Sequence, residues 1–421
     1  MISLAYAALW LFIFSLPWES IIRVPGVAIV SRATGGLALA IALFAVASTA
    51  RVRRWHPLHV AAFLFVISAA CGLFMLSSDR LPAKFWTFVQ LFLVLFMIWE
   101  LATSWRRVVG LFGAYVLGAW VSSVATVLLY RRQGEQLRRF AAGGADANDL
   151  AMTLVLALPM AWYLSIVARQ RFLRWACRGY LLIGLVSILL TGSRGGMLAS
   201  IVALTIVPLS MTKLSPRKLA TALTILLIGG GLAAAYVPEK IVNRLATTQS
   251  EVEDLRLGGR FKLWVAGIRA FVYKPMMGYG SGGFVRAITP QLGSESLVAH
   301  NSYLSVLVEE GVVGLTLYLA MLLATFRAVL TLPQLERRFA LVLLATLATA
   351  MLPLTWEDRK PVWFILAALV GLSRAQSAGG ILEKAALRTS QRAPGRVGPG
   401  AVPRLDARSG PRPSADRSPS A

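Results

Sequence analysis

Acidic residues are scarce in this chain, and charged residues of both signs are few. Only 19 of the 421 residues are Asp or Glu, against 43 Lys or Arg, and charged residues make up 15% of the sequence. A soluble domain carries about 25% charged residues. Because 57% of the residues are apolar, the composition argues against a soluble globular protein and favours one embedded in a membrane.

Residues that build metal and thiol sites are also scarce. The only two cysteines, Cys71 and Cys177, lie near the ends of different apolar segments and have no metal-ligand spacing. We expect them to lie toward opposite membrane faces, which excludes a disulfide between them. Because no acidic cluster has convincing metal spacing and no Gly-x-Ser-x-Gly elbow is present, we disfavour metal-dependent and serine chemistry and expect no cofactor.

Apolar runs long enough to cross a bilayer, about 17 to 25 residues, recur along most of the sequence. A chain in lipid must satisfy its own backbone hydrogen bonds, so continuous runs of this length favour helices over a barrel. The first run, from Leu4 to about Leu16, has no basic start and no clear cleavage site, so we expect a retained helix. We predict an all-α, polytopic transmembrane helical bundle of about twelve spans with one large helical periplasmic loop.

The predicted spans form two groups around that loop. Transmembrane helices 1–9 occupy residues 1–236, the loop occupies 237–300, transmembrane helices 10–12 occupy 301–375, and a basic tail covers 376–421. The spans lie near residues 2–17, 33–50, 58–77, 84–101, 106–130, 149–168, 177–192, 195–211, 218–237, 301–326, 339–355 and 361–374. Several of them are short enough to be tilted or only partly embedded, and all boundaries have a tolerance of a few residues.

Basic residues give the orientation, since short loops rich in Lys and Arg stay in the cytoplasm. Such residues recur in alternate loops, at Arg51, Arg53, Arg54, Arg106, Arg107, Arg169, Arg171, Arg174, Arg178, Lys213, Arg217, Lys218, Arg327, Arg337 and Arg338. Both termini are then cytoplasmic, and the large loop faces outward. One short outward segment departs from this rule. Its outward arginine cluster, Arg131, Arg132, Arg138 and Arg139, would contact either an anionic ligand or lipid headgroups.

The formal net charge of +24 does not indicate a nucleic-acid partner, because the basic residues are spread among short loops and the tail. The tail is rich in Gly, Ala, Pro, Ser and Arg and lacks apolar periodicity, so we expect it to be disordered. Its charge would favour contact with anionic membrane lipids, but we favour a simple solvated tail over a specific binding module.

The outward loop has an organisation of its own. Five apolar side chains recur at helical spacing, namely Phe261, Trp264, Val265, Ile268 and Phe271. This spacing predicts an amphipathic helix along the membrane surface. Two glycines place Arg260 at its N-terminus, where backbone N–H groups favour an anion, and Pro275 ends it. The glycine-rich segment that follows, Gly278 to Gly283, either lets a ligand approach closely or only redirects the chain.

Two polar residues stand out at the predicted outer face. His300 precedes an apolar helix and lies beside the basic loop, whose cations would lower its pKa and keep the imidazole neutral, as a general base requires. Arg194 joins two apolar spans, where it either extends its charge to the membrane surface or binds a phosphate group. On spacing alone, a structural role stays open for both residues.

Four of these features together resemble the O-antigen ligase and polymerase superfamily of bacterial envelope proteins. They are Ser193-Arg194-Gly195-Gly196, Gly259-Arg260-Phe261-x-x-Trp264, Pro275-x-x-Gly278-x-Gly280 with Phe284, and His300-Asn301-x-x-Leu304 followed by Glu310-Gly311. The resemblance covers about residues 190–360, and the earlier spans match only in being apolar. No single motif is specific, but their order around one large outward loop is.

The resemblance implies a polytopic inner-membrane glycosyltransferase that takes its glycan from undecaprenyl diphosphate. Ligases transfer the glycan to lipid A–core in lipopolysaccharide biosynthesis, polymerases extend the repeat chain, and related oligosaccharyltransferases modify protein hydroxyls. The short chain without a large C-terminal periplasmic domain fits a ligase best, and a polymerase comes next. A lipid-linked glycan flippase is the alternative from a different class. We disfavour it because a flippase should line its cavity with charge from several spans, whereas these spans are nearly uncharged.

The resemblance also indicates the site residues. Arg194 and Arg260 match the family's two arginine positions and His300 matches its histidine position, so we expect these three residues to be catalytic and both arginines to bind the diphosphate. Asn301 is expected to cap a helix or orient groups beside the substrate. Arg269 and the outward arginine cluster are expected to contact substrate phosphates. The implied mechanism needs no metal and inverts the anomeric centre.

Overall fold

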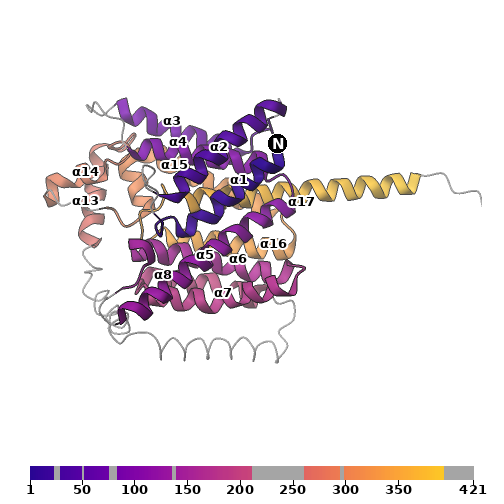
Figure 1. The fold of residues 1–421 in the computed structure, drawn as a ribbon. Coiled ribbons are helices and arrows are strands. Elements are labelled where there is room, and N and C mark those ends of the chain that lie inside the picture. Colours follow the sequence, from indigo (N-terminus) through magenta and orange to yellow (C-terminus); the bar gives the residue numbers. More distant parts are fainter. Residues whose placement is uncertain are drawn as a thin grey trace, which may run out of the picture. The chain divides into compact units, whose positions relative to one another are not determined.

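The computed structural model describes residues 1–22, 29–49, 52–74, 83–134, 139–210, 260–293 and 298–392. Within these residues every regular element is a helix (Figure 1), which confirms the predicted all-α class. The chain divides into two units, residues 1–378 and 379–421. The helix bundle belongs to the first unit.

The bundle consists of helices that run back and forth between two ends. They are α1 (Ile2–Ser15), α2 (Val30–Thr49), α3 (Pro57–Phe74), α4 (Ala83–Leu101), α5 (Trp105–Gln133), α6 (Ala147–Val167), α7 (Arg171–Leu190), α8 (Arg194–Leu204), α9 (Ile206–Ser210), α13 (Arg260–Tyr273), α14 (Phe284–Leu292), α15 (Ser302–Leu330), α16 (Gln334–Ala350) and α17 (Lys360–Arg392). The helices α13 and α14 lie at one end of the bundle, here called the α13 end, and the N-terminus lies at the opposite end (Figure 1).

Six of the described helices are long and apolar enough to cross a membrane. They are Val30–Ser48, Ala83–Leu101, Trp105–Gln133, Ala147–Val167, Arg171–Leu190 and Ser302–Leu330. Shorter apolar helices cover Ile2–Trp18, Pro57–Gly72 and Arg194–Ser210, each at a predicted span. The predicted span at residues 218–237 lies outside the described residues. The count of twelve spans, the periplasmic side of the large loop and the cytoplasmic side of the termini therefore stay predictions.

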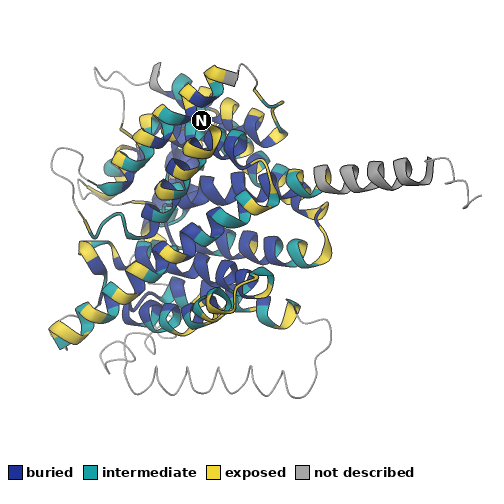
Figure 2. Ribbon diagram, turned by 45° about the vertical axis from the view of Figure 1, so that its right-hand side comes forward, coloured by how far each residue is buried: buried dark blue, intermediate teal, exposed yellow. Residues whose placement is uncertain are grey.

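Most residues of α6 are buried, and α5, α7, α8 and α16 pack around it (Figure 2). Small residues permit the close contacts, because helix pairs in lipid depend on tight packing. A Cβ on Gly118 would lie 2.2 Å from Phe14 O, and one on Gly196 would lie 2.8 Å from Ala151 Cβ. Outer helices expose large apolar side chains such as Phe44, which suits a surface that faces lipid.

The helix α15 is interrupted at Gly311, where φ is 68° and ψ is −168°. A break of this kind frees carbonyl groups that a straight helix would pair internally. The glycine-rich segment between α13 and α14 supplies their partners. Tyr279 N donates to Val308 O at 3.0 Å, and Gly280 N donates to Glu309 O at 2.7 Å. The break therefore gives α15 free carbonyl groups to which the backbone amides of the loop can donate.

The contact between this segment and α15 depends on glycine. On the far side of the break, Val312 N donates to Pro275 O at 2.8 Å. A Cβ on Gly278, whose φ is 64°, would lie 2.5 Å from two carbonyl oxygens of α15, and a Cβ on Gly311 would lie 2.1 Å from Met276 O. At Gly278 the close approach is thus to the backbone of α15, which favours the structural interpretation of that glycine.

The helix α17 extends beyond the predicted start of the tail. It continues to Arg392, whereas the sequence predicts disorder from residue 376. The stretch from Ile381 to Leu387 consists of Ile, Leu, Glu, Lys and Ala, most of which favour a helix. The predicted boundary is therefore too early for this helix, and residues 393–421 lie outside the described residues.

Replacement of Gly311 by Ala should lower the stability of the folded protein. Its backbone conformation is nearly exclusive to glycine and costs another residue on the order of 1–3 kcal/mol, and the new Cβ would collide with Met276 O. Thermal unfolding in detergent measures the effect. The control is Gly36→Ala in α2, where a Cβ meets no heavy atom within 4 Å. Equal unfolding temperatures for the two variants would contradict the stabilising contact between the glycine-rich segment and the break in α15.

Candidate functional site

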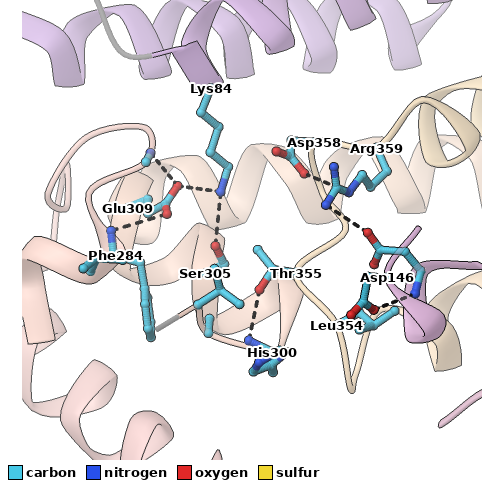
Figure 3. A pocket seen from close by; sticks show the side chains of 15 residues that line it. Lys84, Asp146, Phe284, His300, Ser305, Glu309, Leu354, Thr355, Asp358 and Arg359 are labelled. Atoms are coloured by element: carbon cyan, nitrogen blue, oxygen red, sulfur yellow. Dashed lines mark hydrogen bonds and ion pairs between the residues drawn. The ribbon is translucent and has the colours of Figure 1, made fainter. Parts of the chain in front are cut away.

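A pocket of about 350 Å³ lies at the α13 end of the bundle. Its lining brings together residues from distant parts of the sequence, including Lys84, Asp146, His300, Glu309 and Arg359 (Figure 3). Lys84 and Arg359 thus stand beside His300 and four acidic residues, namely Asp146, Asp149, Glu309 and Asp358. The pocket carries charge of both signs, which differs from the purely cationic site that the sequence predicts.

His300 is held by its backbone at the entrance to α15. Its N–H donates to Thr355 Oγ1 at 3.0 Å, in the loop between α16 and α17 (Figure 3). Its φ of 47° is positive, and strained backbone of this kind tends to occur at functional sites. The next residue, Asn301, accepts a hydrogen bond from Leu304 N at 3.0 Å and so caps α15, as the sequence predicts.

The surroundings of His300 favour its neutral form. Burial lowers the pKa of the imidazole, and Arg260 lowers it further, while Asp146 acts in the opposite direction. A neutral imidazole can accept a proton. Because both Arg260 and Asp146 act electrostatically on His300, the start of α13 and the start of α6 belong to the same site.

Arg260 is the first residue of α13 and is half-buried. The predicted helix start is therefore confirmed, and the helix ends two residues before Pro275, also as predicted. Trp264 Nε1 donates to Ala299 O at 3.0 Å. This hydrogen bond ties α13 to the residue that precedes His300, so the helix and the histidine are linked through the backbone.

The apolar faces of α13 differ from the prediction. The buried face, which packs with α14 and α15, uses the smaller residues Leu263, Ala266, Gly267 and Ala270. Of the predicted apolar residues, Phe261 and Ile268 are exposed, and so is Val272. Small side chains are buried here because the three helices approach closely. The larger ones form an exposed apolar stripe of the kind that can enter a membrane surface.

Arg194 is the first residue of α8 and is half-buried. The next residue, Gly195, packs against the loop between α16 and α17, since a Cβ there would lie 2.7 Å from Pro353 Cγ. The same loop holds His300. The start of α8 and His300 are thus neighbours of one loop, although neither Arg194 nor Arg260 lines the pocket itself.

One member of the outward arginine cluster lies next to this site. Arg139 is half-buried and donates to Thr191 O at 2.9 Å and to Asn148 Oδ1 at 2.7 Å. Thr191 belongs to the turn that precedes Arg194, and Asn148 belongs to the first turn of α6. Arg139 therefore braces the two helix starts against each other.

The other arginines that are predicted to contact substrate and that the structure describes do not line the pocket. Arg131 and Arg132 are exposed in the last turn of α5. Arg269 is exposed on α13, about 13 Å along the helix from Arg260 at 1.5 Å per residue. Arg138 lies outside the described residues. The structure thus brings together Arg194, Arg260, His300 and Arg139, but not the exposed arginines.

A buried ion cluster in the wall of the pocket has no counterpart in the sequence prediction. Lys84 Nζ lies 2.7 Å from Glu309 Oε2 and 2.6 Å from Glu357 Oε1, and it donates to Ser305 Oγ at 3.3 Å. The prediction of nearly uncharged spans is therefore wrong for α15, which carries Glu309 and Glu310. The signal for this cluster is a charged residue within an apolar run, which is costly unless it is paired.

Glu309 also links the ion cluster to the glycine-rich segment. Its Oε2 accepts a hydrogen bond from Gly282 N at 2.9 Å, and its Oε1 accepts one from Phe284 N at 3.4 Å (Figure 3). The neighbouring carboxyl of Glu310 accepts a hydrogen bond from Ser281 Oγ at 2.6 Å. The two glutamate carboxyls therefore bind a serine side chain and two backbone amides of the segment. These bonds add to those that the segment makes with the carbonyls of α15 at the break.

A second ion pair fixes the loop that holds His300. Arg359 Nη2 lies 3.0 Å from Asp149 Oδ2, and Trp356 Nε1 donates to Asp149 Oδ1 at 2.9 Å. Asp146, one turn earlier, caps α6 by accepting a hydrogen bond from the N–H of Asn148 at 2.8 Å. The start of α6 is thus bound to the loop between α16 and α17.

Replacement of Lys84 by Met should destabilise the fold strongly, because it leaves Glu309 and Glu357 buried without a cation. Removal of one partner from a buried ion pair costs about 3–5 kcal/mol. Thermal unfolding in detergent measures the loss. Lys360→Met is the control, since its 2.7 Å pair with Glu19 is more exposed and should cost about 1 kcal/mol or less. Similar losses in both lysine variants would contradict a special role for the cluster.

Comparison with known proteins identifies the central part of the chain. Residues 179–319 match the sequence model of the family described as O-Antigen ligase. The matched segment contains the starts of α8 and α13, with Arg194 and Arg260, and also contains His300. No curated protein matches the chain. In this central segment, which is about a third of its length, the chain is similar to the O-antigen ligase family.

Proposed function

We propose that the protein is an O-antigen ligase, which transfers a glycan from undecaprenyl diphosphate to a sugar hydroxyl of lipid A–core. The reaction would take place at the periplasmic face of the bacterial inner membrane. The observation that carries this proposal is the pocket lined by His300, which lies within the segment that matches the ligase family. Six helices long and apolar enough to cross a membrane support the location.

In the proposed reaction, the oxygen of the acceptor hydroxyl attacks the anomeric carbon of the glycan. The bond from that carbon to the diphosphate oxygen breaks, and its electron pair leaves with undecaprenyl diphosphate. His300 takes the proton of the hydroxyl, which its neutral imidazole can accept. Attack on the side opposite the leaving group inverts the anomeric centre. Diphosphate is a good leaving group, so no protein acid is needed to protonate it.

Arg194 and Arg260 are proposed to bind the diphosphate. Guanidinium groups form parallel charge-assisted hydrogen bonds with phosphate oxygens, and they would stabilise the charge that develops as the glycosyl bond breaks. Each arginine is the first residue of a helix, where the backbone N–H groups also favour an anion. With two guanidinium groups opposite the diphosphate, the mechanism includes no metal.

The pocket itself is proposed to hold the acceptor sugar. Asp146, Asp358 and Thr355 line it, and their oxygens can accept hydrogen bonds from sugar hydroxyls. Arg194 and Arg260 stand outside this lining, so the proposed diphosphate site and the proposed acceptor site are separate.

Two alternative activities would use the same lipid-linked donor with a different acceptor. An O-antigen polymerase would extend the lipid-linked glycan, and a protein O-oligosaccharyltransferase would modify a protein hydroxyl. The description of the matched family favours the ligase. The acceptor decides between them, because only a ligase needs lipid A–core to form product. A flippase would move the lipid-linked glycan across the bilayer without any glycosyl transfer.

Purified protein in proteoliposomes with lipid-linked glycan and lipid A–core should transfer the glycan in the presence of EDTA. His300→Ala should lower turnover about 10²–10⁴-fold, and Arg194→Ala or Arg260→Ala should lower it about 10²–10³-fold. Lys262→Ala is the control, because Lys262 is exposed on α13. A need for added divalent metal would contradict the metal-free mechanism. Undiminished turnover of the His300 variant would remove the histidine from the chemistry.

The lowered pKa of His300 predicts how turnover depends on pH. The proposed base acts when neutral, so turnover should fall as the pH drops through the pKa of His300, which lies below its usual value of 6.5. Arg260 contributes to that lowering after burial. Arg260→Gln should therefore raise the pKa and move the acid limb of the profile to higher pH, whatever its residual rate.

The matched control for this experiment is Lys262→Gln, which removes one positive charge from the exposed side of the same helix. Its acid limb should coincide with that of the unmodified protein. If the limb of the Arg260 variant also stays in place, the group that titrates is not His300.

A further inference from the structure

A second pocket lies at the opposite end of the bundle from His300. It has a volume of about 510 Å³ and is lined by residues of α3, α15 and α17 and by the loop before α3. On α15 the lining of the first pocket ends at Glu309 and that of the second begins at Ala320, which is roughly 16 Å further along at 1.5 Å per residue. The second pocket therefore has no part in the proposed transfer reaction.

The second pocket is positively charged. His56, Arg327 and Arg374 line it, and none of its lining residues is acidic. Within the described residues neither arginine forms an ion pair. Burial lowers the pKa of His56, and Arg374 lowers it further, which reflects their proximity. Glu336 contacts the neighbouring Gln376 at 3.5 Å but does not line the pocket.

Hydroxyl groups complete the polar side of the pocket. Thr331 Oγ1 and Ser373 Oγ lie 2.8 Å apart, and Ser377 lies one turn further along α17. Thr331 Oγ1 donates to Ala328 O at 2.8 Å and Ser377 Oγ donates to Ser373 O at 3.1 Å. The guanidinium groups, which form strong charge-assisted hydrogen bonds, are therefore the donors for a phosphate. Two arginines that form no ion pair with the described residues thus match the chemistry of a phosphate group.

The remaining lining is apolar and, apart from Leu323, made of small side chains. Ala61 of α3, Ala320 and Ala324 of α15 and Val370 of α17 form this part. The apolar surface continues outward along α15, where Leu319, Leu323 and Phe326 are exposed. Small side chains in the pocket leave room for a hydrocarbon chain, and the exposed ones provide the surface along which such a chain can lie. A free phosphate would use only the polar side.

We propose that this pocket binds an anionic phospholipid. The phosphate lies between Arg327 and Arg374, and an acyl chain covers the apolar part of the pocket beside Ala324. Basic pockets between membrane helices are suited to anionic headgroups, and this one combines the charge with a volume typical of small-molecule sites. The occupant would join α3, α15 and α17 at the end of the bundle that the basic residues predict to be cytoplasmic.

Native mass spectrometry of the full chain in detergent tests this, with phosphatidylglycerol as the anionic lipid and phosphatidylcholine as the neutral one. The unmodified protein should retain phosphatidylglycerol in preference. Arg327→Gln with Arg374→Gln should weaken its binding about tenfold or more. Arg169→Gln with Arg171→Gln is the control, because both residues are exposed outside the pocket and their loss removes the same charge. This variant should bind as the unmodified protein does.

A second variant keeps the charge and fills the apolar part. Ala324→Phe should weaken the binding of phosphatidylglycerol, and glycerol 3-phosphate, which has no acyl chain, should fail to compete at equal concentration. Glycan transfer in phosphatidylcholine vesicles should be unchanged in all these variants, which shows that they are folded. The proposal is overturned if the unmodified protein does not prefer phosphatidylglycerol. It is also overturned if both arginine pairs lose binding equally, if the Ala324 variant binds normally, or if glycerol 3-phosphate competes fully.

Discussion

The break in α15 at Gly311 is the constraint on which the geometry of the site depends. A straight helix would pair the carbonyls of Val308 and Glu309 internally. The glycine-rich segment would then have no partner beside an apolar helix, where unpaired backbone groups are costly. Because the break offers those carbonyls, a segment without regular structure can pack firmly against a helix long enough to span the membrane. The same segment joins α13 to α14. It therefore helps to position α13, whose first residue is Arg260.

Ion pairs position the loops around the contact between the glycine-rich segment and α15. Lys84 joins α4 to α15 and to the loop before α17, and the Asp149–Arg359 pair joins that loop to α6. Pairs in a low-dielectric setting contribute little net stability, because desolvation offsets their attraction. Their main effect here is to specify position. His300 is bound to the same loop through Thr355, so its place depends on charges from three separate helices.

The features that the sequence predicts well are those set by neighbours in the chain. The start of a helix at Arg260, its end before Pro275 and the cap at Asn301 all follow from local chemistry and are confirmed. The pairing of Lys84 with Glu357 joins residues 273 positions apart. Hydrophobic periodicity states which face of a helix is apolar but not which helix it meets, so no pattern in the sequence specifies this contact.

At His300 the residue that would best stabilise the backbone differs from the residue that the proposed chemistry needs, because its φ is positive. Glycine and asparagine adopt such a conformation with less strain, so either would relax the backbone while removing the proposed base. A histidine that persists there is not what folding alone would select. In a library of variants ranked only by yield of folded protein, glycine or asparagine at this position would therefore look harmless or beneficial. Their damage would become visible only when the transfer of glycan is the property selected.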